Sequence, residues 1–202
     1  MNALNKMNLP NKLTLFRVFL IPFFVLFMCL SVKEGTIAYF RAEPTEKFLL
    51  YRWTALVIFS VASLTDLLDG RIARQYDLVT NFGKFMDPLA DKLLVCTALI
   101  LLSTEGSLPV WVTLIIIARE FIISGFRLLA CEKGIVIAAS TWGKLKTNFQ
   151  IILCIYLILP TLSFRIGKTV TWILVIIATA LTLISLIDYI RKNISVISEG
   201  GN

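Results

Sequence analysis

Four aspartates lie close together in the sequence at spacings that suit a metal site. They form two pairs, Asp66 with Asp69 and Asp87 with Asp91, and residues three or four apart share one face of a helix. Four converging carboxylates repel one another strongly unless a cation lies among them. Oxygen ligands favour a hard divalent ion such as Mg²⁺ or Mn²⁺. We therefore expect a metal site here, and roughly two such ions would neutralise it.

Small residues accompany these carboxylates at helical spacing. Gly70 and Ala73 fall in the same arc of a helix as Asp66 and Asp69, and Gly83 precedes Asp87 by four residues. Without bulky side chains, such positions let a flat base, a ribose or a diphosphate approach the helix backbone closely. Next to Ala73, Arg74 has the charge and the planar donors to hold a phosphate.

Structural explanations exist for some of these residues taken singly. Asp87 followed by Pro88 is typical of a helix N-cap and first helical position, and Asp69-Gly70 is typical of a turn. Arg74 alone is also consistent with a cytoplasmic membrane anchor. Asp66 is harder to explain structurally, because it ends a long apolar run and has no basic residue beside it.

The composition indicates an integral membrane protein. Of the 202 residues, 57% are apolar and 16% are charged, and the mean hydropathy is +0.83. A soluble domain of this length cannot bury that much apolar surface. Histidine is absent, which excludes every His-based catalytic group or metal ligand, and the four cysteines form no CxxC pair. We therefore expect no zinc site.

Six apolar runs have about the length that spans a bilayer. We expect an all-α membrane protein with six transmembrane helices and a single domain over residues 1–202, since no internal repeat is evident. A mildly amphipathic segment, Leu4–Lys12, is expected to lie along the membrane interface. The expected spans are Leu13–Val32, Phe48–Leu68, Leu89–Ser103, Pro109–Ala130, Phe149–Phe164 and Val170–Ile190.

Basic residues predict the orientation of these spans. With the N-terminus in the cytoplasm, most Lys and Arg residues fall on the inside, so we expect both termini and the acidic cluster to be cytoplasmic. No small-residue cleavage site follows the first run, so it is expected to remain as an anchor in the cell membrane. The net charge of +7 suits an anionic leaflet, and no nucleic-acid partner is expected.

Taken together, the acidic and small residues form the pattern DxxDGxxARx8GxxxDxxxD, running from Asp66 to Asp91. This pattern resembles the signature of the CDP-alcohol phosphatidyltransferases and departs from it at no fixed position. The resemblance implies a two-metal site on the four aspartates, with Asp91 also acting as the general base. It further implies that Gly70, Ala73, Arg74, Thr80 and Gly83 face the CDP group.

A second segment of the family pattern precedes the first span. Asn11, Thr14 and Arg17 match an NxxTxxR segment found in relatives, and the resemblance makes them candidates for contact with the nucleotide or the headgroup. The alternative is structural, with Thr14 as a helix N-cap and Arg17 as an anchor at the interface.

Basic residues further along the chain suggest a site for the acceptor alcohol. Arg119 and Glu120 lie inside the fourth apolar run, where charges are costly and therefore often functional. We expect a cationic pocket of the size of a phosphate, unless Arg119 is simply compensated by Glu120 and the lysines anchor the chain at the membrane. The candidate residues are Arg119, Arg127, Thr141, Lys144 and Lys146.

The segments around Arg119 and Lys144 resemble the bacterial family members that transfer a phosphatidyl group from CDP-diacylglycerol to glycerol 3-phosphate. The resemblance implies phosphatidylglycerophosphate and CMP as products, and a homodimer. An acceptor such as inositol phosphate or phosphatidylglycerol would share the same acidic signature. A cation transporter is the alternative from another class, but transporters hold their ions near the bilayer midplane between repeats.

Overall fold

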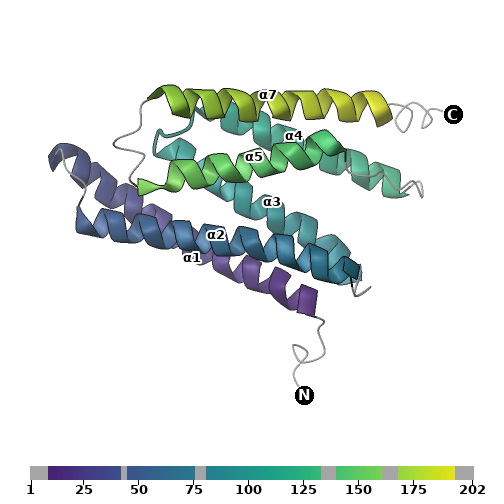
Figure 1. The fold of residues 1–202 in the computed structure, drawn as a ribbon, viewed down its shortest axis with the longest axis horizontal. Coiled ribbons are helices and arrows are strands. Elements are labelled where there is room, and N and C mark those ends of the chain that lie inside the picture. Colours follow the sequence, from purple (N-terminus) through teal and green to yellow (C-terminus); the bar gives the residue numbers. More distant parts are fainter. Residues whose placement is uncertain (1–8, 42–44, 76–80, 133–139, 161–167, 194–202) are drawn as a thin grey trace, which may run out of the picture. The chain divides into compact units, whose positions relative to one another are not determined.

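The protein is helical throughout residues 9–41, 45–75, 81–132, 140–160 and 168–193, apart from short connections; these are the residues that the computed structural model describes (Figure 1). No strand occurs in these ranges. The helices are α1 (Leu9–Arg41), α2 (Glu46–Gln75), α3 (Asn81–Thr104), α4 (Val110–Glu132), α5 (Thr141–Ile158) and α7 (Lys168–Asn193).

The prediction of an all-α protein is confirmed for the described residues, whereas six membrane spans are not confirmed. Within the described residues, three segments are long and apolar enough to cross a membrane: Asn11–Gly35, Glu46–Asp66 and Thr169–Asn193. Helix α4 carries Arg119, Glu120 and Arg127 inside its expected span, and α5 carries two lysines just before its expected span. Residues 9–12 continue into α1, and the rest of the expected interfacial segment lies outside the described residues.

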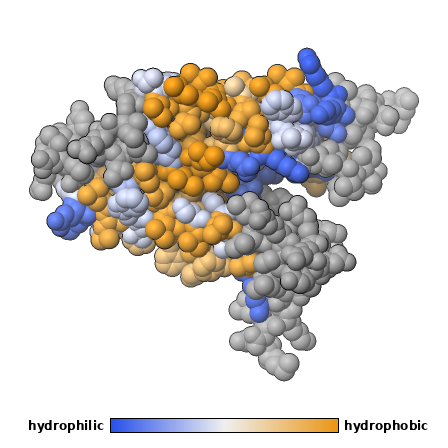
Figure 2. Space-filling model, in the orientation of Figure 1, coloured by the Kyte–Doolittle hydropathy of each residue, from blue (hydrophilic) through white to orange (hydrophobic). Residues whose placement is uncertain are grey.

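Apolar side chains cover much of the surface that Figure 2 shows. Every described helix exposes several of them. Trp111 and Phe121 on α4 and Ile176 on α7 are more than half exposed. A water-soluble protein rarely exposes so much apolar surface, whereas lipid tails cover it at no cost. The surface therefore agrees with the composition in placing these helices in a membrane.

The chain divides into two compact units. The first contains Met1–Ser107 and Cys154–Arg165, and the second contains Leu108–Leu153 and Ile166–Asn202. In the first unit α1 packs against α2 and α3, and α2 also contacts α3. In the second unit α4 packs against α7.

Alternating steps of three and four residues define the face on which α1 and α2 pack. Such 3–4 spacing keeps side chains on one stripe of a helix. The stripes meet in the core, where the rings of Phe24 and Phe59 lie 5.5 Å apart between centroids. Each stripe also carries polar residues at its ends. Its members on α1 are Thr14, Arg17, Ile21, Phe24, Met28 and Ser31, and those on α2 are Phe48, Arg52, Ala55, Phe59, Ala62 and Asp66.

A buried ion pair joins α2 to the turn after α3. The guanidinium of Arg52, which is 1% exposed, donates to both carboxylate oxygens of Glu105 at 2.5 and 2.7 Å. It also donates to the carbonyl oxygens of Leu157 and Ile158, at 2.7 and 2.8 Å, which end α5. These carbonyls have no partner within their own helix, so the arginine satisfies them. Arg52 thus lies on the packed stripe of α2, within the expected span Phe48–Leu68.

The turn that presents Glu105 requires a glycine. The amide of Gly106 donates to the carbonyl of Ser103 at 3.1 Å, and that of Ser107 donates to Leu102 at 3.0 Å. This is the Schellman pattern, in which the residue after the helix cap is left-handed, and Gly106 has a φ of 80°. A side chain would be strained at this position.

We predict that Glu105→Gln destabilises the purified protein by about 3 to 5 kcal/mol, because it leaves the buried Arg52 charge uncompensated. The measurement is thermal unfolding in detergent. Glu34→Gln is the matched control, since among the described residues Glu34 accepts a single long hydrogen bond, at 3.4 Å, from Thr45. Equal melting temperatures for the two variants would show that the Arg52–Glu105 pair contributes no stability.

Candidate active site

The acidic residues of the predicted metal site lie on two helices. Helix α2 continues without a break to Gln75, so it carries Asp66 and Asp69 together. Helix α3 begins at Asn81 and carries Asp87 and Asp91. The two helices contact each other within the first unit.

This arrangement excludes the local structural explanations for two of the aspartates. The predicted turn at Asp69-Gly70 is wrong, because helix α2 runs through it. The N-cap predicted for Asp87 is also wrong, because α3 starts six residues earlier and Asp87 lies inside the helix. An N-cap must precede the first helical residue, so Asp87 cannot have that role here.

The described side chains include Asp66 and Asp91, which are both half-buried. The side chains of Asp69, Gly70, Ala73, Arg74, Gly83 and Asp87 lie outside the described set, and so does the whole of Thr80. Among the side chains that are described, no three acidic or cysteine residues group together.

Asp66 is held by an arginine from another helix. Arg17 on α1 places its Nη1 atom 2.9 Å from the Oδ1 atom of Asp66. The arginine side chain has no exposed surface, whereas that of Asp66 is 29% exposed. Nε of Arg17 also donates to the carbonyl oxygen of Ala62 at 3.3 Å, one turn before Asp66.

The other two residues of the N-terminal segment are buried on the same helix. Asn11 is 6% exposed and Thr14 has no exposed surface. The N-cap predicted for Thr14 is wrong, because α1 already begins at Leu9. Arg17 is also no anchor at the membrane surface, since its charge is buried against Asp66.

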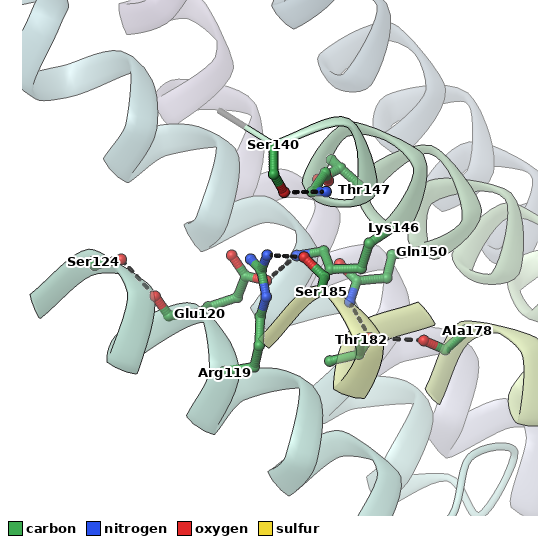
Figure 3. A network of polar contacts seen from close by, with 11 residues as sticks. Arg119, Glu120, Ser124, Ser140, Lys146, Thr147, Gln150, Ala178, Thr182 and Ser185 are labelled. Atoms are coloured by element: carbon green, nitrogen blue, oxygen red, sulfur yellow. Dashed lines mark hydrogen bonds and ion pairs between the residues drawn. The ribbon is translucent and has the colours of Figure 1, made fainter. Parts of the chain in front are cut away.

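The second unit contains a cluster of charged residues around Glu120 (Figure 3). Oε1 of Glu120 accepts from Nζ of Lys146 on α5 and lies 3.3 Å from Nη1 of Arg119. Nη2 of Arg119 donates to the hydroxyl of Ser185 on α7 at 2.5 Å. Arg119 and Lys146 are 6% and 2% exposed. The Glu120 carboxylate thus joins α4 to α5, and Arg119 joins α4 to α7.

Neighbouring residues fix the helices that carry this cluster. The hydroxyl of Ser140 accepts from the amide of Gly143 at 3.1 Å and so caps the start of α5. A Cβ atom on Gly143 would lie 3.4 Å from Oγ of Ser140 and 3.7 Å from Nη2 of Arg119, both ordinary contact distances, so the α5 backbone passes close to the guanidinium. Further along α5, Gln150 donates to the hydroxyl of Thr182 on α7 at 3.2 Å.

The cluster has more positive than negative charge. One carboxylate faces two buried cations, so a net positive charge remains. Nε of Arg119 is buried and has no hydrogen-bond partner among the described residues. A buried donor without a partner is costly, and an anion such as a phosphate would satisfy it.

The structure therefore brings together two of the five residues expected around the acceptor, Arg119 and Lys146. The side chains of Arg127, Thr141 and Lys144 are exposed. The compensation of Arg119 by Glu120 that the sequence suggested is present as well. Sequence reasoning missed Ser185, which carries no signal beyond being a polar residue in an apolar helix.

Comparisons with known proteins match nearly the whole chain. The model of the CDP-alcohol phosphatidyltransferase family matches residues 7–184. The CDP-diacylglycerol--glycerol-3-phosphate 3-phosphatidyltransferase of Bacillus subtilis is 41% identical over 192 residues, which cover 92% of this chain and 95% of that protein. The protein of the same name from Escherichia coli K12 is 38% identical over 194 residues, covering 91% and 93%. A probable phosphatidylglycerophosphate synthase of Mycobacterium tuberculosis is 39% identical, covering 92% and 81%.

Proposed function

This chain belongs to the CDP-alcohol phosphatidyltransferase family, and we propose that it transfers the phosphatidyl group of CDP-diacylglycerol to glycerol 3-phosphate. The products are phosphatidylglycerophosphate and CMP. Relatives that carry the name of this reaction are similar along more than nine-tenths of the chain, which supports the choice of substrates.

The donor site is built on the two acidic helices. Asp66, Asp69, Asp87 and Asp91 supply only carboxylate oxygens, and this donor set fits Mg²⁺ or Mn²⁺, two ions for each protein chain. When bound, these ions neutralise the diphosphate of the donor and the charge on departing CMP. Asp66 fits such a role because part of its carboxylate side chain is exposed although Arg17 contacts it.

Other residues of this unit hold the nucleotide part of the donor. Gly70, Ala73 and Gly83 leave room for the CDP group beside the helix backbones, and Arg74 and Thr80 bind its polar atoms. We also assign Asn11 and Thr14 to this site; both lie near the start of α1.

The chemical step is a displacement at the phosphorus on the lipid side of the diphosphate. A free hydroxyl of glycerol 3-phosphate forms the new oxygen–phosphorus bond, the bond from that phosphorus to the CMP oxygen breaks, and Asp91 accepts the hydroxyl proton. A carboxylate in reach of the hydroxyl acts as a general base. Orientation of the two substrates and electrostatic stabilisation supply the remaining rate enhancement.

The acceptor is held through its phosphate. The observation that carries this assignment is the buried pair Arg119 and Lys146, which share a single carboxylate and leave a net positive charge. Guanidinium and ammonium groups both bind phosphate oxygens strongly. Arg127, Thr141 and Lys144 contribute from the exposed parts of the same helices. An alcohol without a phosphate would leave this charge unmatched.

We further propose that the whole chain forms one membrane domain in the cell membrane, with six spans and both termini and the active site facing the cytoplasm. The excess of basic residues on that side supports this orientation. The water-soluble acceptor, which carries at least one negative charge, is then reached from the cytoplasm. The working form is a homodimer, by analogy with the family.

The test is CMP release from CDP-diacylglycerol by the purified protein in detergent with Mg²⁺. We expect release with glycerol 3-phosphate and none with serine, inositol phosphate, phosphatidylglycerol or no acceptor. Release with another acceptor instead would retain the donor site and contradict the role of Arg119 and Lys146. Folded protein that released no CMP with any acceptor would contradict the proposed reaction as a whole and favour a transporter.

A further inference from the structure

Among the described side chains of the first unit, two arginines are fully buried, Arg17 and Arg52, and they differ in what they contact. Arg52 donates hydrogen bonds to the carbonyl oxygen of Ile158 at the end of α5 and to the carboxylate of Glu105. Both residues lie outside the acidic pattern. Arg17 instead contacts Asp66, one of the four aspartates of that pattern. A buried charge is costly, so the Arg17–Asp66 contact needs an explanation that includes what Asp66 does.

The packing of α1 on α2 fixes the position of Arg17. The residue lies on the 3–4 stripe of α1 and has no exposed surface. Its Nε atom donates to the carbonyl of Ala62, and its Nη1 atom lies 2.9 Å from Oδ1 of Asp66. The planar guanidinium thus contacts α2 at two points one helical turn apart, and this limits the orientations that the Asp66 carboxylate can adopt.

The same contact leaves part of Asp66 accessible. Arg17 approaches from the buried side through Oδ1, and 29% of the Asp66 side chain remains exposed. A carboxylate that is oriented by a second group and still partly accessible has the properties of a metal ligand with a supporting partner.

We propose that Arg17 is a positioning residue for the metal site: it orients Asp66 so that this carboxylate binds the divalent ion, and it does not itself contact the nucleotide. The inference rests on the proposed function, because it takes Asp66 to be a metal ligand. It gives Arg17 a role different from the nucleotide or headgroup contact that the family pattern suggests.

The two effects of Arg17 on metal binding have opposite signs, which makes the inference testable. As a positive charge beside the ligand, Arg17 repels the ion, so its removal would tighten metal binding if charge alone mattered. As a support for Asp66, its removal weakens metal binding, and loss of such a partner typically costs about 10- to 100-fold in affinity.

The experiment measures Mn²⁺ binding to substrate-free protein in detergent, from the electron paramagnetic resonance signal of free Mn²⁺. The variants are Arg17→Gln, which removes the charge, and Arg17→Lys, which keeps the charge but loses the two-point contact. We expect both to bind Mn²⁺ about 10-fold or more weakly than the unchanged protein. We also expect excess Mn²⁺ to restore the kcat of Arg17→Lys with no change in the KM for glycerol 3-phosphate.

Arg52→Lys is the matched control. Arg52 is also buried and ion-paired, but it lies about 21 Å from Asp66 along α2. Its replacement is expected to lower the melting temperature without changing the affinity for Mn²⁺. The Mn²⁺ affinity of each variant is measured well below its own melting temperature. If Arg17→Gln does not fold, the measurement on Arg17→Lys alone decides the test.

Two results would overturn the inference and are distinguishable from each other. In the first, Asp66→Asn loses affinity for Mn²⁺, but a folded Arg17 variant binds Mn²⁺ at least as tightly as the unchanged protein. Arg17 then has no positioning role, and the proposed metal site is retained. In the second, the unchanged protein itself binds no Mn²⁺. This result contradicts both the proposed metal site and the role of Arg17.

Discussion

Asp91→Asn is expected to lower the rate of CMP release by about 10³-fold or more, because the proposed function makes this residue both the general base and a ligand of the metal site. The amide has nearly the shape of the carboxylate, so binding of CMP should largely persist. The rate is measured with CDP-diacylglycerol and glycerol 3-phosphate at saturating Mg²⁺, and CMP binding is measured by thermal stabilisation of the same preparation.

Asp188→Asn is the matched control for this variant. It makes the same chemical change on α7, where Asp188 forms an ion pair with the exposed Lys192 at 2.7 Å. Its activity is expected to stay close to that of the unchanged protein. If Asp91→Asn kept full activity, Asp91 would be neither the base nor an essential ligand.

Arg119→Ala is expected to raise the KM for glycerol 3-phosphate by about 10- to 100-fold, the effect of losing one or two charge-assisted hydrogen bonds to a phosphate. The KM for CDP-diacylglycerol should change little, because the donor is bound by other residues. The measurement is the initial rate of CMP release at a series of concentrations of each substrate.

The removal of Arg119 also leaves Glu120 paired with Lys146 alone, so the melting temperature must be measured alongside the kinetics. Arg191→Ala, at the exposed end of α7, controls for the loss of one positive charge. An unchanged KM for glycerol 3-phosphate in folded Arg119→Ala would remove this residue from the acceptor site.

The helices were predictable from the sequence, but their ends were not. Apolar runs located α1, α2 and α7 because lipid requires a long apolar segment whatever the tertiary structure. The helices extend beyond these runs, as at Asp69 to Gln75 of α2, because polar residues continue a helix as well as apolar ones do. Hydropathy alone ended the second span at Leu68, whereas the three- and four-residue spacing of the aspartates predicted the helices on which the structure places them.

The partners of the buried charges were not predictable in the same way. Arg17 and Asp66 are far apart in the sequence and meet only because the packed stripes of α1 and α2 face each other. Arg52 lies inside the expected span Phe48–Leu68, and sequence reasoning did not single it out as a buried charge. The 3–4 spacing that it shares with Phe48 and Ala55 was the signal that it is buried.

The cluster in the second unit illustrates a further limit. The sequence singled out Arg119 as a charge within an apolar run, and it placed Glu120 beside it. It predicted Lys146 on α5 in the same pocket as Arg119, but it gave no sign that Lys146 pairs with Glu120 or that Ser185 on α7 reaches Arg119. Such a contact depends on how three helices pack, and no local pattern encodes it.

The central claim is that the acceptor hydroxyl attacks the phosphorus on the lipid side of CDP-diacylglycerol. The most direct measurement is mass spectrometry of both products of one reaction with glycerol 3-phosphate. We predict equal amounts of CMP and phosphatidylglycerophosphate. Phosphatidic acid together with a cytidylyl ester of glycerol 3-phosphate would contradict the claim, because attack would then have occurred at the phosphorus on the nucleotide side.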